Sequence, residues 1–166
     1  EFRADLMGAL ITLVVLGVGL IVAIYSKLPV EEETPGKEHL FHTLFLLQIT
    51  GLAGICLTGD AFNLYVLIEV AALTGYGLIA IGSKRAAAGA FNYVILGTIG
   101  ASLYLLGVGY VYITTGTLNM VGIHDAIVAS AETKNNLADS ASMQVAFVLI
   151  CLGILIKMAF FPFHAW

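Results

Sequence analysis

Two ionisable residues lie inside long apolar stretches of this sequence. Lys157 is the only charged residue of MQVAFVLICLGILIKMAFFPFHAW, the segment 143–166, and Pro162 follows it five positions later. Glu69 lies in AFNLYVLIEVAALTGYGLIAIG. Ionisable residues at membrane depth are unfavourable in isolation, and they mark proton relays and ion pathways. The two side chains are therefore the first candidates for chemistry, and the chemistry they suggest is proton translocation.

Glu69 is placed near the middle of a predicted spanning helix. At about 1.5 Å per residue it lies roughly 13 Å from Asp60, within a hydrocarbon core about 30 Å thick. Burial disfavours the charged carboxylate and a nearby cation favours it, so a small rearrangement can switch its protonation. The alternative is a glutamate that only hydrogen-bonds a neighbouring helix.

Lys157 is placed just before a predicted helix break. Pro162 has no N–H, and its ring clashes with the carbonyl of Met158. We expect the carbonyls just past Lys157 to lose their helical partners and to present a negative dipole end to the ammonium group. A lysine balanced between burial and this dipole can bind and release a proton. In the alternative, Lys157 snorkels to the interface from a helix that tilts or ends early.

Weaker candidates surround these two. His164 follows the break and is either a proton relay or an interfacial residue beside Trp166. Asp60 suits a helix N-cap. The other histidines are not spaced like metal ligands, and we assign them no chemistry: His39, His42 and His124.

The composition indicates an integral membrane protein. Of 166 residues, 60% are hydrophobic and 11% are charged, and the mean hydropathy is +0.98; soluble domains carry about 25% charged residues. The net charge of −4 and the absence of a basic stripe argue against nucleic acid. Cys56 and Cys151 lie in apolar runs without a CxxC or Cys/His pattern, so no metal, cofactor or redox chemistry is predicted for this chain.

Five stretches are long and apolar enough to span a bilayer, which predicts an all-α polytopic transmembrane bundle. They cover residues 6–24, 40–57, 61–81, 90–113 and 145–161, and the last is expected to be broken. The stretch 114–142 is polar, with helix-spaced apolar residues, and is expected to form a surface loop or helix. We expect residues 1–166 to form a single membrane domain.

The connections between these stretches differ in length. KLPVEEETPGKEHL is charged and contains prolines, which predicts an aqueous loop. Only Leu57–Asp60 separates the second and third stretches, with Gly59 suited to a C-cap and Asp60 to an N-cap, which predicts a tight hairpin.

Loop charges suggest an orientation. The loops after the first and third stretches hold four basic residues (Lys27, Lys37, Lys84 and Arg85), and the other side holds Arg3 and Lys134. The positive-inside rule places the loops of the first group on the cytoplasmic side. The membrane is expected to be the plasma membrane of the cell. The chain opens on Glu1-Phe2 and stops just after the break, so we interpret it as a fragment of a larger polytopic protein. Whether Glu1-Phe2 is a cloning scar is left open.

Three segments resemble the proton-conducting antiporter-like membrane subunits of respiratory complex I, of Mrp-type sodium/proton antiporters and of membrane-bound hydrogenases. They are LTGDAFNLYVLIEVAALTGYGLIAIG, YVILGTIGASLYLLGVGYVYITTGTLNM and ILIKMAFFPFHAW. The TGDxFNLYVxxE run and GTLNM are most similar to the D-like branch of the Mrp antiporter proteins. The resemblance covers nearly the whole chain.

This resemblance implies a larger protein of about fourteen helices with two inverted repeats. The fragment would hold its third to seventh helices. Glu69 would match the family's glutamate, Lys157 the lysine of the broken helix, and His164 the histidine that follows the break. The implied partners are other membrane subunits, the lipid bilayer and protons, with sodium left open.

The function predicted is therefore ion translocation by an intramembrane Glu69–Lys157 pair, in an Mrp-type antiporter or a related respiratory or hydrogenase complex. One alternative is a proton-pumping subunit of a complex I-type quinone oxidoreductase. Two others belong to different classes: a membrane scaffold that transports nothing, and a transporter of a small organic solute that binds at the break by Pro162.

Overall fold

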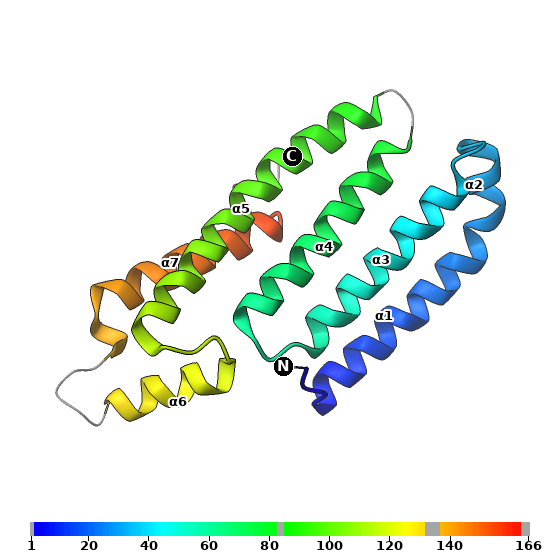
Figure 1. Ribbon diagram of the computed structural model, residues 1–166. Coiled ribbons are helices and arrows are strands. Elements are labelled where there is room, and N and C mark those ends of the chain that lie inside the picture. The colour runs from blue at the N-terminus through cyan, green and yellow to red at the C-terminus, as the bar shows by residue number, and fades with distance from the viewer. Residues whose placement is uncertain (1, 83–84, 132–136, 164–166) are drawn as a thin grey trace. The chain divides into compact units, whose positions relative to one another are not determined.

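The computed structural model describes residues 2–82, 85–131 and 137–163, and these residues are built from helices (Figure 1). In chain order the helices are α1 (Leu6–Tyr25), α2 (Lys27–Glu33), α3 (Glu38–Leu57), α4 (Ala61–Ala80), α5 (Ala86–Thr115), α6 (Met120–Ala131), the short 3-10 helix η1 (Leu137–Asp139) and α7 (Ala141–Lys157). The predicted all-α class is confirmed.

Four of these helices are long and apolar enough to cross a membrane: α1, α3, α4 and α5. They match the first four predicted stretches to within a few residues. The fifth stretch corresponds to α7, which begins at Ala141 and has 17 residues, the lower end of the range that spans a bilayer. It ends at Lys157 and not near residue 161 as predicted.

The segment predicted as an aqueous loop after α1 contains the short helix α2. Its proline, Pro29, is the third residue of this helix. In the first helical turn the N–H groups have no intrahelical acceptor, so a proline there loses nothing. The proline signal therefore indicated a loop where the chain begins a new helix.

The chain divides into two compact units. Unit 1 contains Gly59–Tyr65 and Leu96–Trp166, and unit 2 contains Phe2–Thr58 and Val66–Ile95. The predicted single membrane domain stays a prediction.

In unit 2, α3 packs closely against α4. A Cβ placed on Gly51 would lie 2.9 Å from the backbone nitrogen of Ala71, so only glycine permits this approach. Gln48 and Thr74 join the same two helices by a hydrogen bond. Helix α1 runs alongside α3 (Figure 1), where Gly19 faces Ile49. Small residues at such positions let membrane helices approach each other closely, and here they fix the helix that carries Glu69.

In unit 1, α5 packs against α7 in the same way. A Cβ on Gly153 would lie 2.7 Å from the carbonyl oxygen of Gly100 and 2.8 Å from the backbone nitrogen of Tyr104. The buried core beside this contact consists of Ala61, Tyr104 and Val108. This packing fixes α7, the helix that carries Lys157.

The start of α4 is tied to the start of α6. The Ala61 N–H donates to the Leu118 carbonyl at 2.9 Å, and the Met120 N–H donates to the Gly59 carbonyl at 2.9 Å. The Asp60 carboxylate accepts from the Asn63 N–H at 2.8 Å, which confirms the predicted N-cap. The predicted C-cap differs, because Thr58, in an extended conformation, follows the last residue of α3 and occupies that position.

Candidate functional site

Glu69 is the ninth residue of α4 and lies near the middle of this 20-residue helix, as predicted. Its side chain is half-buried. The close contact of Gly51 with Ala71 holds the helix two residues further along. The Glu69 carboxyl group also acts electrostatically on the phenol of Tyr76, two helical turns away in the same unit.

A band of polar side chains follows Glu69 in unit 2. The Thr74 hydroxyl, with 5% of the residue exposed, lies 2.6 Å from the side-chain oxygen of Gln48 and donates to it. The rings of Tyr76 and Tyr93 meet edge to face with centroids 4.5 Å apart. The sequence pattern marks Thr74, Tyr76 and Tyr93 as polar residues of a path or as interhelical contacts. Gln48 was not among the predicted site residues, although a lone glutamine in the apolar run FHTLFLLQIT is a signal for a polar contact inside the membrane.

Tyr76 is unusual within this band. The residue is 5% exposed, and its hydroxyl has no hydrogen-bond partner among the residues that the structure describes. Leaving a buried polar group unsatisfied costs about 1–3 kcal/mol. A buried hydroxyl without a partner is rare in proteins and calls for an explanation.

Lys157 is the last residue of α7, and its side chain is half-buried. The helix end is closed by two backbone bonds: the Phe160 N–H donates to the Leu155 carbonyl at 3.0 Å, and the Ala159 N–H donates to the Ile156 carbonyl at 3.1 Å. This is the Schellman arrangement, which needs a left-handed residue at the position of Ala159. Ala159 has φ 52°, a conformation that alanine adopts at a cost.

The predicted cause of the helix end was therefore wrong. The helix stops at Lys157, five residues before Pro162, because the chain turns through the left-handed Ala159. The end of the helix still brings its negative dipole next to the ammonium group, as expected. An early helix end is also the condition under which a lysine snorkels, so transport measurements must separate the two interpretations.

The two charges belong to different units, Glu69 to unit 2 and Lys157 to unit 1. Their coupling stays a prediction. His164, predicted to be either a proton relay or an interfacial residue, lies outside the described residues, as do Lys84 and Lys134, which the orientation argument used. Asp60 caps α4 beside the contact with α6.

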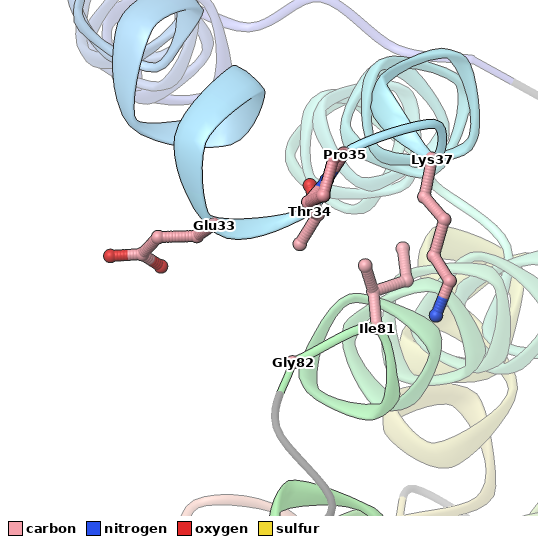
Figure 2. Close-up of a pocket in the computed structure, with 6 residues that line it drawn as sticks. All are labelled: Glu33, Thr34, Pro35, Lys37, Ile81 and Gly82. Atoms are coloured by element: carbon pink, nitrogen blue, oxygen red, sulfur yellow. The ribbon is translucent and has the colours of Figure 1, made fainter.

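A cavity of about 520 Å³ lies elsewhere in unit 2, at the end of α4. It is lined by Glu33, Thr34, Pro35, Lys37, Ile81 and Gly82. Figure 2 shows the side chains of Glu33, the last residue of α2, and of Lys37, just before α3, extending in different directions. Both are exposed, and neither of the two intramembrane charges reaches the lining, so this recess is not the candidate ion site.

A metal centre finds no support in the described part of the chain. Across residues 2–82, 85–131 and 137–163, no three His, Cys, Asp or Glu side chains lie close enough together to hold a metal ion. Cys56 and Cys151 are free thiols. Glu69, Lys157 and Tyr76 supply carboxyl, ammonium and phenol groups, which are suited to carry charge and protons.

Comparisons with known proteins show the family to which the chain is similar. Residues 58–166 match the family model described as NADH:quinone oxidoreductase/Mrp antiporter, TM. NADH-quinone oxidoreductase subunit N of Desulforudis audaxviator is 44% identical over 97% of this chain and 30% of the relative. A subunit of the Na(+)/H(+) antiporter of Bacillus subtilis is 32% identical over 98% of this chain and 31% of the relative.

A solved structure is also similar. A chain of the membrane-bound sulfane sulfur reductase, an archaeal respiratory membrane complex, superposes with a TM-score of 0.82 at 34% identity, covering 96% of this chain and 31% of that chain. The present chain therefore spans about a third of the length of the relatives it matches.

Proposed function

We infer the function from the family of the chain, which belongs to the NADH:quinone oxidoreductase and Mrp antiporter transmembrane proteins. We propose that the chain is the ion-translocating part of a longer multi-pass membrane subunit. The ion is the proton, and the parent complex is an Mrp-type antiporter or a related respiratory assembly. Glu69, an acid near the middle of a spanning helix, is the observation that supports this proposal most strongly.

In the proposed mechanism Glu69 and Lys157 influence each other's protonation. A nearby carboxylate favours the protonated form of the lysine, and this influence ends when the carboxyl group is neutralised or moves away. At an effective dielectric constant near 20, two unit charges 4 Å apart interact by roughly 4 kcal/mol. A direct coupling of this size is enough to drive stepwise release. An influence that passes through residues of the longer protein would be weaker.

The backbone at the end of α7 supports the role of Lys157. The last carbonyls of a helix carry a partial negative charge, which stabilises a cation next to them. The half-buried Lys157 lies at this end of α7, and in the proposed mechanism it takes up and releases the proton there. His164, seven residues later in the sequence, is the proposed next relay, because an imidazole exchanges protons near neutral pH.

We place the protein in the plasma membrane, with the loops after α1 and α4 on the cytoplasmic side. The described basic residues of these loops are Lys27, Lys37 and Arg85, all exposed, against Arg3 on the other side. Excess Lys and Arg mark cytoplasmic loops. The proposed partners are the other membrane subunits of the complex and the surrounding lipid.

A second candidate function is a proton-pumping subunit of a quinone oxidoreductase, which the 44% identity to a subunit N favours. The two candidates differ in what drives the ion. A sodium gradient drives proton movement in an antiporter, whereas electron transfer to quinone drives it in a pump. Measuring both in one reconstituted complex assigns the parent.

The test is to replace each charge in the full-length protein within its complex, as Lys157→Met and Glu69→Gln, and to measure proton movement in vesicles. We expect at least a tenfold loss in each, because one positioned acid–base group contributes about 10²–10⁴ to a proton transfer rate. Lys27→Met and Glu32→Gln remove the same charges from exposed positions of α2 and should leave proton movement unchanged.

The alternatives predict other results. Wild-type proton movement in both Lys157→Met and Glu69→Gln contradicts the proposal. Loss of the assembled complex, with normal transport by the fraction that assembles, supports a scaffold. A lysine that only snorkels predicts that Lys157→Met is harmless while Glu69→Gln is not.

A further inference from the structure

Tyr76 and Glu69 share one face of α4. Seven residues separate them, which is about 20° short of two full turns and about 10 Å along the axis. Long side chains in helices lean toward the N-terminus, so the Tyr76 ring is expected to lean toward the turn that carries Glu69, while the shorter Glu69 side chain leans the same way and leaves a gap between the two groups. The electrostatic influence of the Glu69 carboxyl on the Tyr76 phenol agrees with this placement.

The Tyr76 ring packs against a neighbouring ring, whereas the Tyr76 hydroxyl has no hydrogen-bond partner among the described residues. Tyr93 of α5 packs edge to face against the ring, with 75° between the planes. Only 5% of Tyr76 is exposed. The hydroxyl oxygen is buried and has no hydrogen-bond partner among the described residues. Packing alone would be served by phenylalanine, so the hydroxyl requires an explanation of its own.

The other polar pair of the band, Gln48 and Thr74, is joined by a hydrogen bond of its own. Gln48 accepts a hydrogen bond from Thr74 through its side-chain oxygen. Thr74 lies about 200° around the helix from Tyr76, on the side that faces α3. The titratable groups around the Tyr76 hydroxyl are therefore Glu69 on its own helix and Tyr93 on α5.

We propose that Tyr76 is a positioning residue for Glu69, and that its hydroxyl holds one water molecule between itself and the carboxyl group. The water donates to the carboxylate when Glu69 is ionised, and it accepts from the carboxyl when Glu69 is protonated. The hydroxyl turns with it, from donor to acceptor, so both protonation states of Glu69 keep a hydrogen bond. A buried water needs at least two polar partners, and these two groups supply them.

This inference rests on the proposed role of Glu69 as a proton carrier. It adds a requirement for the Tyr76 hydroxyl, which serves Glu69 without carrying net charge itself. Replacing the phenol by phenyl keeps the ring that Tyr93 packs against and removes only the hydroxyl. Tyr76→Phe is therefore the variant that isolates the proposal.

The experiment uses infrared difference spectroscopy and proton movement in vesicles, both on the full-length protein in its complex. The carboxyl C=O band that disappears in Glu69→Gln identifies Glu69. In Tyr76→Phe we expect this band to move to higher wavenumber, because a carboxyl group that loses a hydrogen bond has a stiffer C=O. Proton movement should slow about tenfold, the order expected for one hydrogen bond to a charged group.

Tyr104→Phe is the matched control. Tyr104 is another buried tyrosine, 6% exposed, but its hydroxyl donates to the Ala61 carbonyl at 3.2 Å in unit 1. Its removal should leave the Glu69 band in place and proton movement per assembled complex within twofold of wild type. An effect on transport equal to that of Tyr76→Phe would show that any lost tyrosine hydroxyl slows the protein.

Each result decides the proposal. An unmoved band in Tyr76→Phe, or proton movement within twofold of wild type, overturns the role of Tyr76. Wild-type transport by Glu69→Gln overturns the proposed function instead, while the band shift still reports the water link. Should Tyr76→Phe not assemble, the wild-type protein is measured in H₂¹⁸O: a bound-water O–H band that shifts there and vanishes in Glu69→Gln supports the water, and no such band overturns it.

Discussion

Glu69 and Lys157 are both charges in apolar helices, yet the two units hold them in different ways. Glu69 lies in the interior of α4, where the helix continues on both sides and the backbone groups bond to each other. Lys157 lies at the very end of α7, where backbone carbonyls turn outward. The described feature that acts together with Glu69 is therefore a side chain, the Tyr76 phenol, whereas the feature next to Lys157 is the end of a helix.

This difference teaches how each charge can be tuned. The surroundings of Glu69 change when a side chain such as Tyr76 is replaced. The helix dipole at Lys157 changes when the helix end moves, and that end is set by Ala159 and by the packing of α7 on α5. Substitutions at packing and turn positions should consequently affect the Lys157 end more than the Glu69 end.

The largest effect on stability is expected from Gly153→Ala, one turn before Lys157. The new methyl group would meet backbone atoms of Gly100 and Tyr104 at 2.7–2.8 Å, so α7 must move. We expect a loss of about 1–3 kcal/mol in the free energy of unfolding. Thermal unfolding of the full-length protein in detergent measures it.

Gly109→Ala is the control for this variant. Gly109 lies in the same helix as Gly100, and a Cβ there meets nothing within 4 Å in the described structure. Alanine should be neutral or stabilise the protein by up to about 1 kcal/mol, because it is the better helix former. Equal losses in Gly153→Ala and Gly109→Ala would contradict the close approach of α5 and α7.

A smaller effect of opposite sign is expected from Ala159→Gly. Glycine adopts the left-handed conformation without the steric cost that alanine bears, so the free energy of unfolding should rise by about 1 kcal/mol. Ala126→Gly, in the interior of α6, should lower it by about 0.5–1 kcal/mol. If Ala159→Gly destabilises the protein as Ala126→Gly does, the helix does not end as described.

The smallest effect is expected from Thr74→Val, on the Glu69 side of the comparison. The substitution removes the hydrogen bond to Gln48, and such interhelical bonds in membrane proteins are worth about 0.6 kcal/mol on average. Thr50 donates only to Leu46 of its own helix, so Thr50→Val should change stability less. A loss above about 2 kcal/mol in Thr74→Val would show that side chains hold unit 2 more firmly than proposed.

The long helices were predictable from sequence because apolar length alone defines a spanning segment. Helices α1, α3, α4 and α5 lie where the apolar runs lie. The end of α7 was not predictable in the same way. Pro162 is a strong signal for a helix break, whereas the actual turn uses an alanine, a residue whose propensity favours the helix.

Contacts between segments that are distant in the chain could not be predicted from the sequence either. TGDAFN and TLNM could be recognised as motifs, but nothing in their spacing shows that Gly59 and Ala61 bond to Met120 and Leu118. The positions of Glu69 and Lys157 were readable as isolated charges. The unsatisfied hydroxyl of Tyr76 could not be predicted from the sequence, because the lack of a hydrogen-bond partner can be recognised only once the neighbouring residues are placed.

The central claim is that Glu69 and Lys157 act as one switch, and a double-mutant cycle on the rate of proton movement tests it most directly. The cycle compares Glu69→Gln, Lys157→Met and the double variant in the full-length complex. If the two groups act as a pair, the double variant should be no slower than the slower single variant, because the second change removes an interaction already lost. A double variant slowed by the product of the two single effects would contradict the claim.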